Sequence, residues 1–349
     1  MKIFRKAGKM LLSAIVILLL LLAGFLIYAF ASGPKLSPET DRIIEGVLSS
    51  ELSDVIVGKT GFASSGRLKI WYESISPESS PRGTVLLITA MGGNALDWHP
   101  QVVRAFVEAG YQVVRYDQRG TGMSDWIADW NSRNPYSVAD MAGDAIAVFD
   151  ELEIKKAHVV GLSMGGMVAQ EIAIQHPERV ASLTLLMTSG YVGDPDLPGL
   201  TSRYLFDYLA KGIALLKYRI LGGEKNLIKE RIAKQIMVVG SDGLDVKGTA
   251  EVVLYDLRKR KGVNVRAIFQ HQTAARISGS RYEKLKTLNV PTLVVHGTAD
   301  QFIPVEHGKK LVEVIPNAKG LWLDNVGHIF PVPNMDGLMK NIISHLDHS

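Results

Sequence analysis

Gly161-Leu162-Ser163-Met164-Gly165 is the stretch that decides the fold of this chain. It follows directly on an apolar run, residues 157–160, and precedes a helical pattern over residues 167–175. This order predicts a strand, a sharp turn and a helix with a serine at the apex, and such a tight turn requires very small neighbours. The hydroxyl of Ser163 is then expected above a sheet, at the positive N-terminus of the helix.

A serine hydroxyl in this position becomes a nucleophile only with a base in hydrogen-bond reach and an acid that orients the base. The predicted base is His328, in the loop after a short strand over residues 320–323. The predicted acid is Asp300, in the loop after a buried strand over residues 291–297. The chain order is therefore serine, acid, histidine, with each residue after a different strand.

Other acids and histidines compete for these roles. Asp324 precedes His328 in the same loop, and Asp194 is available if the acid follows the sixth predicted strand instead. Both alternatives stay open at the level of sequence. Three further polar residues are interpreted as structural: His296, His271 and Arg281.

An acyl-transfer site also needs hydrogen-bond donors for its oxyanion. One donor is expected to be the backbone N–H of Met164, the residue after the serine. The other is expected to be the N–H of Met91, in the glycine-containing loop after the strand over residues 84–88. Three residues that flank these positions are predicted to line a substrate pocket, with ordinary core packing as the alternative: Gly92, Phe302 and Ile329.

From about residue 66 to the C-terminus, the chain resembles the α/β-hydrolase superfamily, in the branch of serine ester hydrolases and proline iminopeptidase-like enzymes. The resemblance implies an α/β fold: a mostly parallel, eight-stranded sheet with helices on both faces and an inserted helical cap. The motifs that carry it are residues 161–166, 91–93, 117–124, 296–300 and 327–328.

One departure from the family pattern concerns the loop before Met91. Many relatives have His-Gly there, whereas this chain has Thr89-Ala90. The backbone donor survives the change, so the loop must be supported in another way. The resemblance also implies that Arg119 is an ion-pair partner, and that reactions with an aspartate nucleophile are disfavoured because the nucleophile position holds Ser163.

The N-terminus differs in kind from the rest of the chain. Residues 1–9 carry four basic side chains and no acid, and residues 10–31 form an uncharged, mostly apolar run. That run is long enough to cross a bilayer, and the basic residues before it predict a cytoplasmic N-terminus with the catalytic domain on the far, non-cytoplasmic side, periplasmic or extracellular. A cleaved signal peptide, which would release a secreted protein, is the alternative, since Ala29-Phe30-Ala31 has the form of a cleavage site.

Strands and helices alternate from Thr84 to about residue 190, which predicts a mostly parallel sheet covered on both faces. A strand over residues 68–74 is expected at the antiparallel edge, paired with residues 55–57. Between residues 191 and 286 the alternation gives way to helical stretches. The predicted organisation is a basic segment (1–9), an anchor or signal sequence (10–31), a tether (32–53), the first part of the core (54–190), a helical cap (191–286) and the second part of the core (287–349).

The charge balance excludes one class of partner. Residues 1–9 hold four of the 39 Lys and Arg residues and none of the 35 acidic ones, so the rest of the chain is balanced and gives no support for nucleic-acid binding. The cluster Arg258-Lys259-Arg260-Lys261 is interpreted as a solvated helix end, with contact to an acidic partner or lipid headgroups as the alternative. The chain has no cysteine, no metal-ligand spacing and no phosphate-binding loop, so no cofactor or metal is expected.

Together the motifs and the resemblance predict a membrane-anchored serine hydrolase that cleaves a small-molecule carboxylic ester through an acyl-enzyme. An aminopeptidase or amidase, a thioesterase and a carbon–carbon bond hydrolase would use the same three side chains. A non-catalytic binding protein on the same fold is an alternative of another class. The sequence does not indicate the oligomeric state.

Overall fold

The computed structural model describes residues 2–239, 243–329 and 335–349. Its centre is an eight-stranded sheet with the strand order β1-β2-β4-β3-β5-β6-β7-β8, in which β1, β2 and β4 pair antiparallel and all other neighbours pair parallel. The predicted fold class is confirmed. The strands are β1 (Lys59–Ser65), β2 (Leu68–Ile75), β3 (Thr84–Ile88), β4 (Gln112–Tyr116), β5 (Ala157–Leu162), β6 (Val180–Leu186), β7 (Thr292–Gly297) and β8 (Lys319–Leu323).

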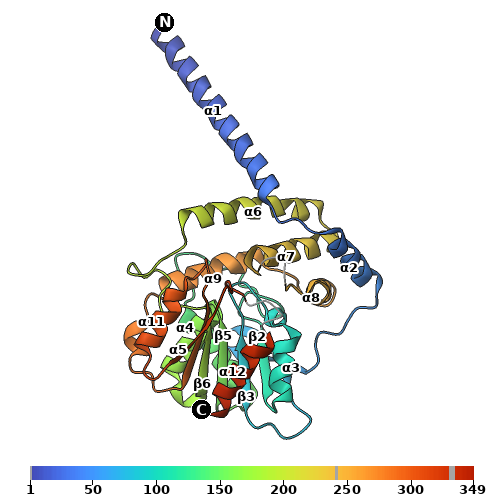
Figure 1. Ribbon diagram of the computed structural model, residues 1–349, viewed down its shortest axis with the longest axis vertical. Coiled ribbons are helices and arrows are strands. Elements are labelled where there is room, and N and C mark those ends of the chain that lie inside the picture. Colours follow the sequence, from blue (N-terminus) through green and yellow to red (C-terminus); the bar gives the residue numbers. More distant parts are fainter. Residues whose placement is uncertain (1, 240–242, 330–334) are drawn as a thin grey trace.

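Helices cover both faces of this sheet (Figure 1). On one face α3 (Pro100–Glu108) and α12 (Met335–Asp347) share a buried apolar cluster with the strands. On the other face α4 (Val138–Glu151), α5 (Met164–Gln175) and α11 (Val305–Val314) do the same. Two covered faces explain why the central strands β3 and β5 read as continuous apolar runs in the sequence.

The antiparallel edge differs from the prediction. The partner of β2 is β1, which begins at Lys59, and not residues 55–57. The polar groups of that segment are taken by side chains: the carboxylate of Glu73 accepts the N–H groups of Val57 (2.7 Å) and Gly58 (2.8 Å), and Arg115 donates to the carbonyl of Val55 (2.9 Å). Because a buried ion pair satisfies this backbone, no strand ladder forms there.

Four helices form the cap between β6 and β7, above the sheet in Figure 1. The segment predicted as a tether contains α2, whose Ile44 is buried with Ile228 and Leu254 of the cap, so this segment is packed. Met1, residues 240–242 of the predicted cap and residues 330–334 of the second core segment lie outside the described residues. The helices of this region are α2 (Pro38–Ser49), α6 (Ser202–Leu221), α7 (Gly223–Val239), α8 (Val246–Lys259) and α9 (Val265–Ile277), followed by the short α10 (Tyr282–Leu285).

The first helix, α1 (Lys2–Ser32), projects away from the body of the molecule (Figure 1). Its part from Lys9 to Ser32 is long and apolar enough to cross a membrane, with a mean hydropathy of 3.1, and most of its large apolar side chains are exposed. The foot of α1 contacts α6, where the ring of Phe206 packs against Phe25 and Tyr28.

Candidate active site

Ser163 stands at a strained turn between β5 and α5. Its backbone has φ 54° and ψ −117°, a conformation that costs about 1–3 kcal/mol in a residue other than glycine. A Cβ atom on Gly161 would meet the carbonyl oxygen of Gly165, and one on Gly165 would meet the carbonyl oxygen of Ile88. The two glycines therefore permit the turn, as the sequence predicts.

Neighbouring strands hold this turn in place. The N–H of Ser163 donates to the carbonyl of Leu186 (2.8 Å), and the hydroxyl of Thr188 donates to the carbonyl of Ser163 (2.6 Å). The serine side chain makes no capping bond to α5, so its hydroxyl is free for other partners.

The structure brings three of the predicted site residues together. Nε2 of His328 lies 2.9 Å from Oγ of Ser163, and Nδ1 lies 2.7 Å from Oδ2 of Asp300. The two loops that carry His328 and Asp300 are bonded to each other, since the N–H of Ala299 donates to the carbonyl of Val326 (2.9 Å). The histidine therefore faces Asp300, not Asp324 or Asp194.

Asp300 is held as a carboxylate. Burial alone would raise its pKa, but hydrogen bonds from His296 and His328 and from the N–H of Ile303 hold the pKa well below its usual range. An ionised carboxylate only accepts hydrogen bonds, so the proton between the two side chains belongs to Nδ1 of His328. Nε2 is then the acceptor that faces the hydroxyl of Ser163.

His296 lies behind this pair. Its Nε2 donates to the carbonyl of Ile303 (2.7 Å) and is 3.3 Å from Oδ2 of Asp300. Its side chain is fully buried. This placement agrees with the interpretation of His296 as a structural side chain that fixes the acid.

The loop after β3 carries the second predicted oxyanion donor, the N–H of Met91. Within the described ranges, the N–H groups of Met91 and Met164 have no protein acceptor, whereas the N–H of Gly92 donates to Nδ1 of His271 (3.0 Å). Gln118 supports the same loop, because its Nε2 donates to the carbonyls of Thr89 (2.9 Å) and Ala90 (3.0 Å).

His271 was interpreted as structural, and the structure shows what it supports. It comes from α9 of the cap, is fully buried, and donates from Nε2 to the carbonyl of Arg119 (2.9 Å). Burial lowers the pKa of His271 to about 4, so the ring is neutral at pH 7 and Nδ1 is free to accept from Gly92. The cap thus supplies the support that the Thr89-Ala90 departure leaves open.

The roof of the site is aromatic. The ring of Phe302 lies 5.4 Å from the ring of His328, and it packs against Tyr208 (4.9 Å) and Tyr204 (5.4 Å) of α6. Phe302 is among the predicted pocket residues, but the two tyrosines are not. The available signal was their spacing of four residues, which places both on one face of α6.

The other two predicted pocket residues lie beside the site. Gly92 has φ +68° and approaches Ile268 of α9 so closely that a Cβ atom would collide with that side chain. Ile329 directly follows His328 and is half-buried. Ser163 itself is only 9 % exposed.

Two arginines near the site are ion-paired. Arg119 pairs with Asp144 through two bonds of 2.6 and 2.8 Å, as predicted. The interpretation of residues 258–261 as a solvated helix end is wrong for Arg260: its side chain is 3 % exposed, bonds to the buried carboxylate of Asp117 and lies 4.6 Å above the ring of Trp71. A buried carboxylate needs such a cation.

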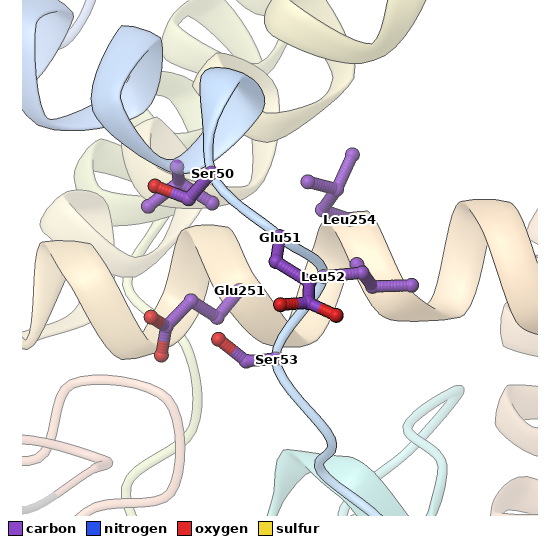
Figure 2. Close-up of a pocket in the computed structure, with 7 residues that line it drawn as sticks. Ser50, Glu51, Leu52, Ser53, Glu251 and Leu254 are labelled. Atoms are coloured by element: carbon purple, nitrogen blue, oxygen red, sulfur yellow. The ribbon is translucent and has the colours of Figure 1, made fainter.

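Figure 2 shows a hollow elsewhere, where the chain leaving α2 passes over α8. Its lining includes Glu51 and Glu251 but no basic residue, and it has room for roughly one water molecule. It shares no residue with the site at Ser163. Across the described parts of the chain, no group of three His, Cys, Asp or Glu side chains could hold a metal ion.

The chain is similar to several known hydrolases. A family model described as alpha/beta hydrolase fold matches residues 83–334. The rhodomycin D methylesterase DauP of a Streptomyces species is 28% identical over 79% of this chain and 94% of that protein. A 2-hydroxy-6-oxononadienedioate/2-hydroxy-6-oxononatrienedioate hydrolase of Paraburkholderia phymatum is 30% identical over 70% of this chain and 80% of that protein.

A solved structure shows the same fold. The esterase RhEst1 from Rhodococcus matches with a TM-score of 0.61 and 20% identity, over 83% of this chain and 98% of that chain. The family and the relatives together define a hydrolase. The chain belongs to the α/β-hydrolase fold family, which confirms the resemblance inferred from the sequence.

Proposed function

We propose that this hydrolase cleaves a small-molecule carboxylic ester through an acyl-enzyme formed on Ser163. The observation that carries the proposal is the continuous hydrogen-bonded chain from Ser163 through His328 to Asp300, with links of 2.9 and 2.7 Å. A serine, a histidine and an acid in this arrangement are the parts that nucleophilic acyl transfer needs.

The reaction follows from the protons and lone pairs of these groups. Nε2 of His328 takes the hydroxyl proton as Oγ of Ser163 bonds to the ester carbon, and the N–H groups of Met91 and Met164 stabilise the oxyanion. The imidazolium then protonates the leaving alcohol. Water attacks the acyl-enzyme with His328 as base, which releases the carboxylic acid and restores Ser163.

Asp300 acts through the histidine. As a carboxylate it fixes the proton on Nδ1 of His328 and stabilises the positive ring that forms during each step. Its low pKa keeps it ionised throughout.

Two observations favour an ester as the substrate. The relatives include methylesterases that match most of the chain. The roof residues Tyr204, Tyr208 and Phe302 carry no positive charge, which suits a neutral apolar ester better than a dicarboxylate. Carbon–carbon bond hydrolysis is the second candidate, because a relative that is 30% identical is named as a hydrolase of 2-hydroxy-6-oxo dioates.

We also propose that α1 is an uncleaved anchor that places the catalytic domain on the non-cytoplasmic side of a membrane. The basic residues before the span support this orientation. The contacts at the foot of α1 support retention, because cleavage after Ala31 would remove the partners of Phe206 and of Asp207, which accepts a hydrogen bond from Tyr28 (2.6 Å).

A fluorophosphonate probe tests the nucleophile. Prompt, stoichiometric labelling of the wild type is expected, and Ser163→Ala abolishes it together with hydrolysis of p-nitrophenyl esters. Ser182→Ala is the matched control, because Ser182 is also a buried serine hydrogen-bonded to a histidine, His158 (2.8 Å), outside the site. A folded wild type that is not labelled, or labelling that persists in Ser163→Ala, would contradict the proposal.

A further inference from the structure

Helix α6 exposes an apolar stripe along one face. Four of its six members follow one another at intervals of four, seven and four residues and share one face of the helix, and Phe206 and Leu221 lie beside that face. Monomeric proteins in water rarely leave a contiguous apolar surface of this kind uncovered. The stripe consists of Leu205, Phe206, Leu209, Leu216, Ile220 and Leu221, which are 43–83% exposed.

The position of α6 indicates what covers this stripe. Figure 1 shows α6 lying across the foot of α1, the helix proposed to span the membrane. The contacts come from Phe25 and Tyr28, in the last part of the apolar span, and Phe206 of α6 packs on both rings at 5.4 and 5.7 Å. Tyrosine at the end of a span is typical of the boundary between lipid and water, and Tyr28 has this position in α1. With α1 in a membrane as proposed, its contact with α6 brings α6 to that boundary.

The charges of α6 agree with this placement. The helix that carries the stripe also carries the basic residues Arg203, Lys211 and Lys217. The acid of this helix, Asp207, already accepts the hydroxyl of Tyr28 (2.6 Å). A basic helix with one strongly apolar face is the type that lies in a membrane interface beside anionic headgroups.

The first turns of the same helix contribute to the roof of the active site from a neighbouring face. Tyr204 and Tyr208 each precede a stripe residue by one position, and both pack on Phe302, which lies against His328. The first turns of α6 thus lie between the proposed lipid surface and the catalytic residues, whereas its last turns pack on α7. Burial raises the pKa of Tyr204 to about 12, so its phenol stays neutral and suits an apolar roof.

We propose that α6 lies in the membrane interface with its apolar stripe in lipid, and that the substrate of Ser163 is a lipophilic ester taken up from that membrane. This inference rests on the proposed esterase function and on the anchor. It adds a second contact with the bilayer and orients the cap, and with it the path to Ser163, towards the lipid.

The placement of α6 can be measured without any enzymatic assay. The chain has no cysteine, so a single introduced cysteine can carry a nitroxide label at a unique position. Labels at Leu209→Cys, Leu216→Cys and Ile220→Cys are compared in the full chain, reconstituted in vesicles of phosphatidylcholine and phosphatidylglycerol. Leu18→Cys in α1 is the lipid control, and Ser349→Cys, at the opposite end of the molecule in Figure 1, is the aqueous control.

The proposal expects the three α6 labels to resemble the Leu18→Cys label: accessible to oxygen and shielded from a water-soluble nickel complex. If they are as accessible to the nickel complex as Ser349→Cys, while Leu18→Cys is lipid-like, the interfacial placement is wrong and the anchor stands. If Leu18→Cys is itself water-accessible, the anchor fails, and the inference fails with it.

The substrate class is tested with two esters. The variant L209Q/L216Q/I220Q is compared with the wild type and with Phe62→Gln, which removes an exposed apolar side chain from the edge strand β1. Hydrolysis of p-nitrophenyl palmitate in vesicles is expected to fall roughly tenfold in the triple variant, because its stripe no longer seats the cap in lipid. The rate of hydrolysis of water-soluble p-nitrophenyl butyrate should be the same in the triple variant, Phe62→Gln and the wild type.

Equal palmitate rates in the triple variant and the wild type would overturn the uptake of substrate from lipid. A wild type that hydrolyses neither ester would instead contradict the proposed esterase function, so the two failures are distinguishable.

Discussion

The core and the cap contribute to the site in different ways. Ser163, Asp300 and His328 follow β5, β7 and β8 of one sheet, and the carboxyl ends of parallel strands meet at one edge. Backbone ladders therefore place these three side chains. The cap contributes Tyr208 and His271 from helices whose positions depend on side-chain packing. The relative positions of Ser163, Asp300 and His328 therefore depend on the strand ladder, whereas the aromatic roof and the support of the loop around Met91 depend on the cap.

The largest effect is expected in the core, at Asp300. Asp300→Asn keeps the size of the side chain but loses the carboxylate that fixes the tautomer of His328, so kcat should fall by about 10⁴-fold. Steady-state hydrolysis of p-nitrophenyl butyrate measures this change. Asp324→Asn, in the loop of His328, is the control and should keep nearly full activity. If Asp324→Asn loses as much activity as Asp300→Asn, the assignment of Asp300 as the acid is wrong.

The second effect concerns stability in the core. Arg115 and Glu73 form a buried pair (2.6 Å) with side-chain exposures of 5% and 0%. Arg115→Met leaves the carboxylate of Glu73 buried without its cation and should lower the free energy of unfolding by about 3–5 kcal/mol. Urea denaturation of the full chain in detergent measures it. The double variant with Glu73→Gln should recover part of the loss, and an unchanged midpoint in Arg115→Met would contradict the prediction.

This contrast also explains what the sequence could reveal. The strands that carry the site are buried apolar runs ended by turn residues, and their order along the chain was enough to select Ser163, Asp300 and His328. The edge strand was misplaced because residues 55–57 look like a strand while their hydrogen bonds go to Glu73 and Arg115. Side chains that compete for backbone groups leave no periodic pattern in a sequence.

The sequence predicts the helices of the cap but not the side-chain contacts that join the cap to the core. Neither the pairing of His271 with Gly92 nor the packing of Tyr208 on Phe302 joins residues close in the chain, and no strand register determines either. Arg260 was assigned to solvent for the same reason, since its partner Asp117 lies in a distant core loop. The departure at Thr89-Ala90 was the one sign in the sequence that another residue supports the oxyanion loop.

The third effect lies in the cap, at His271. His271→Leu leaves the N–H of Gly92 without its acceptor, so the Met91 donor shifts and kcat should fall by about 10–100-fold with little change in KM. His271→Gln can accept and donate and should recover part of the loss. His158→Gln is the control, a neutral core histidine remote from the oxyanion loop. A rise in KM at unchanged kcat would show that His271 shapes the pocket instead.

The pH dependence of stability follows from the same two histidines. Burial lowers the pKa of both His271 and His158 to about 4, below the unfolded value of 6.5, so the unfolded chain binds more protons between these limits. Stability is then full above pH 6.5 and falls as the pH drops towards 4, by about 2 kcal/mol per histidine down to pH 5. Urea denaturation at pH 7 and pH 5 should show a shallower fall in either Gln variant; an equally steep fall would contradict the assignment.

The smallest effect compares one local motif in the two regions, the N-cap of a helix. In the core, Ser137 accepts the N–H of Asp140 (3.2 Å), and Asp140 accepts the N–H of Ser137 (2.7 Å) at the start of α4. In the cap, the hydroxyl of Thr201 accepts the N–H of Tyr204 (3.2 Å) at the exposed start of α6, and Tyr204 has no carboxylate to return the bond. Ser137→Ala should lower the free energy of unfolding by about 1 kcal/mol and Thr201→Ala by about 0.5 kcal/mol. The second loss should be smaller because α6 can fray without exposing the sheet. Equal losses in urea denaturation would mean that cap and core unfold as one unit. The two regions would then differ in how they contribute to the site but not in stability.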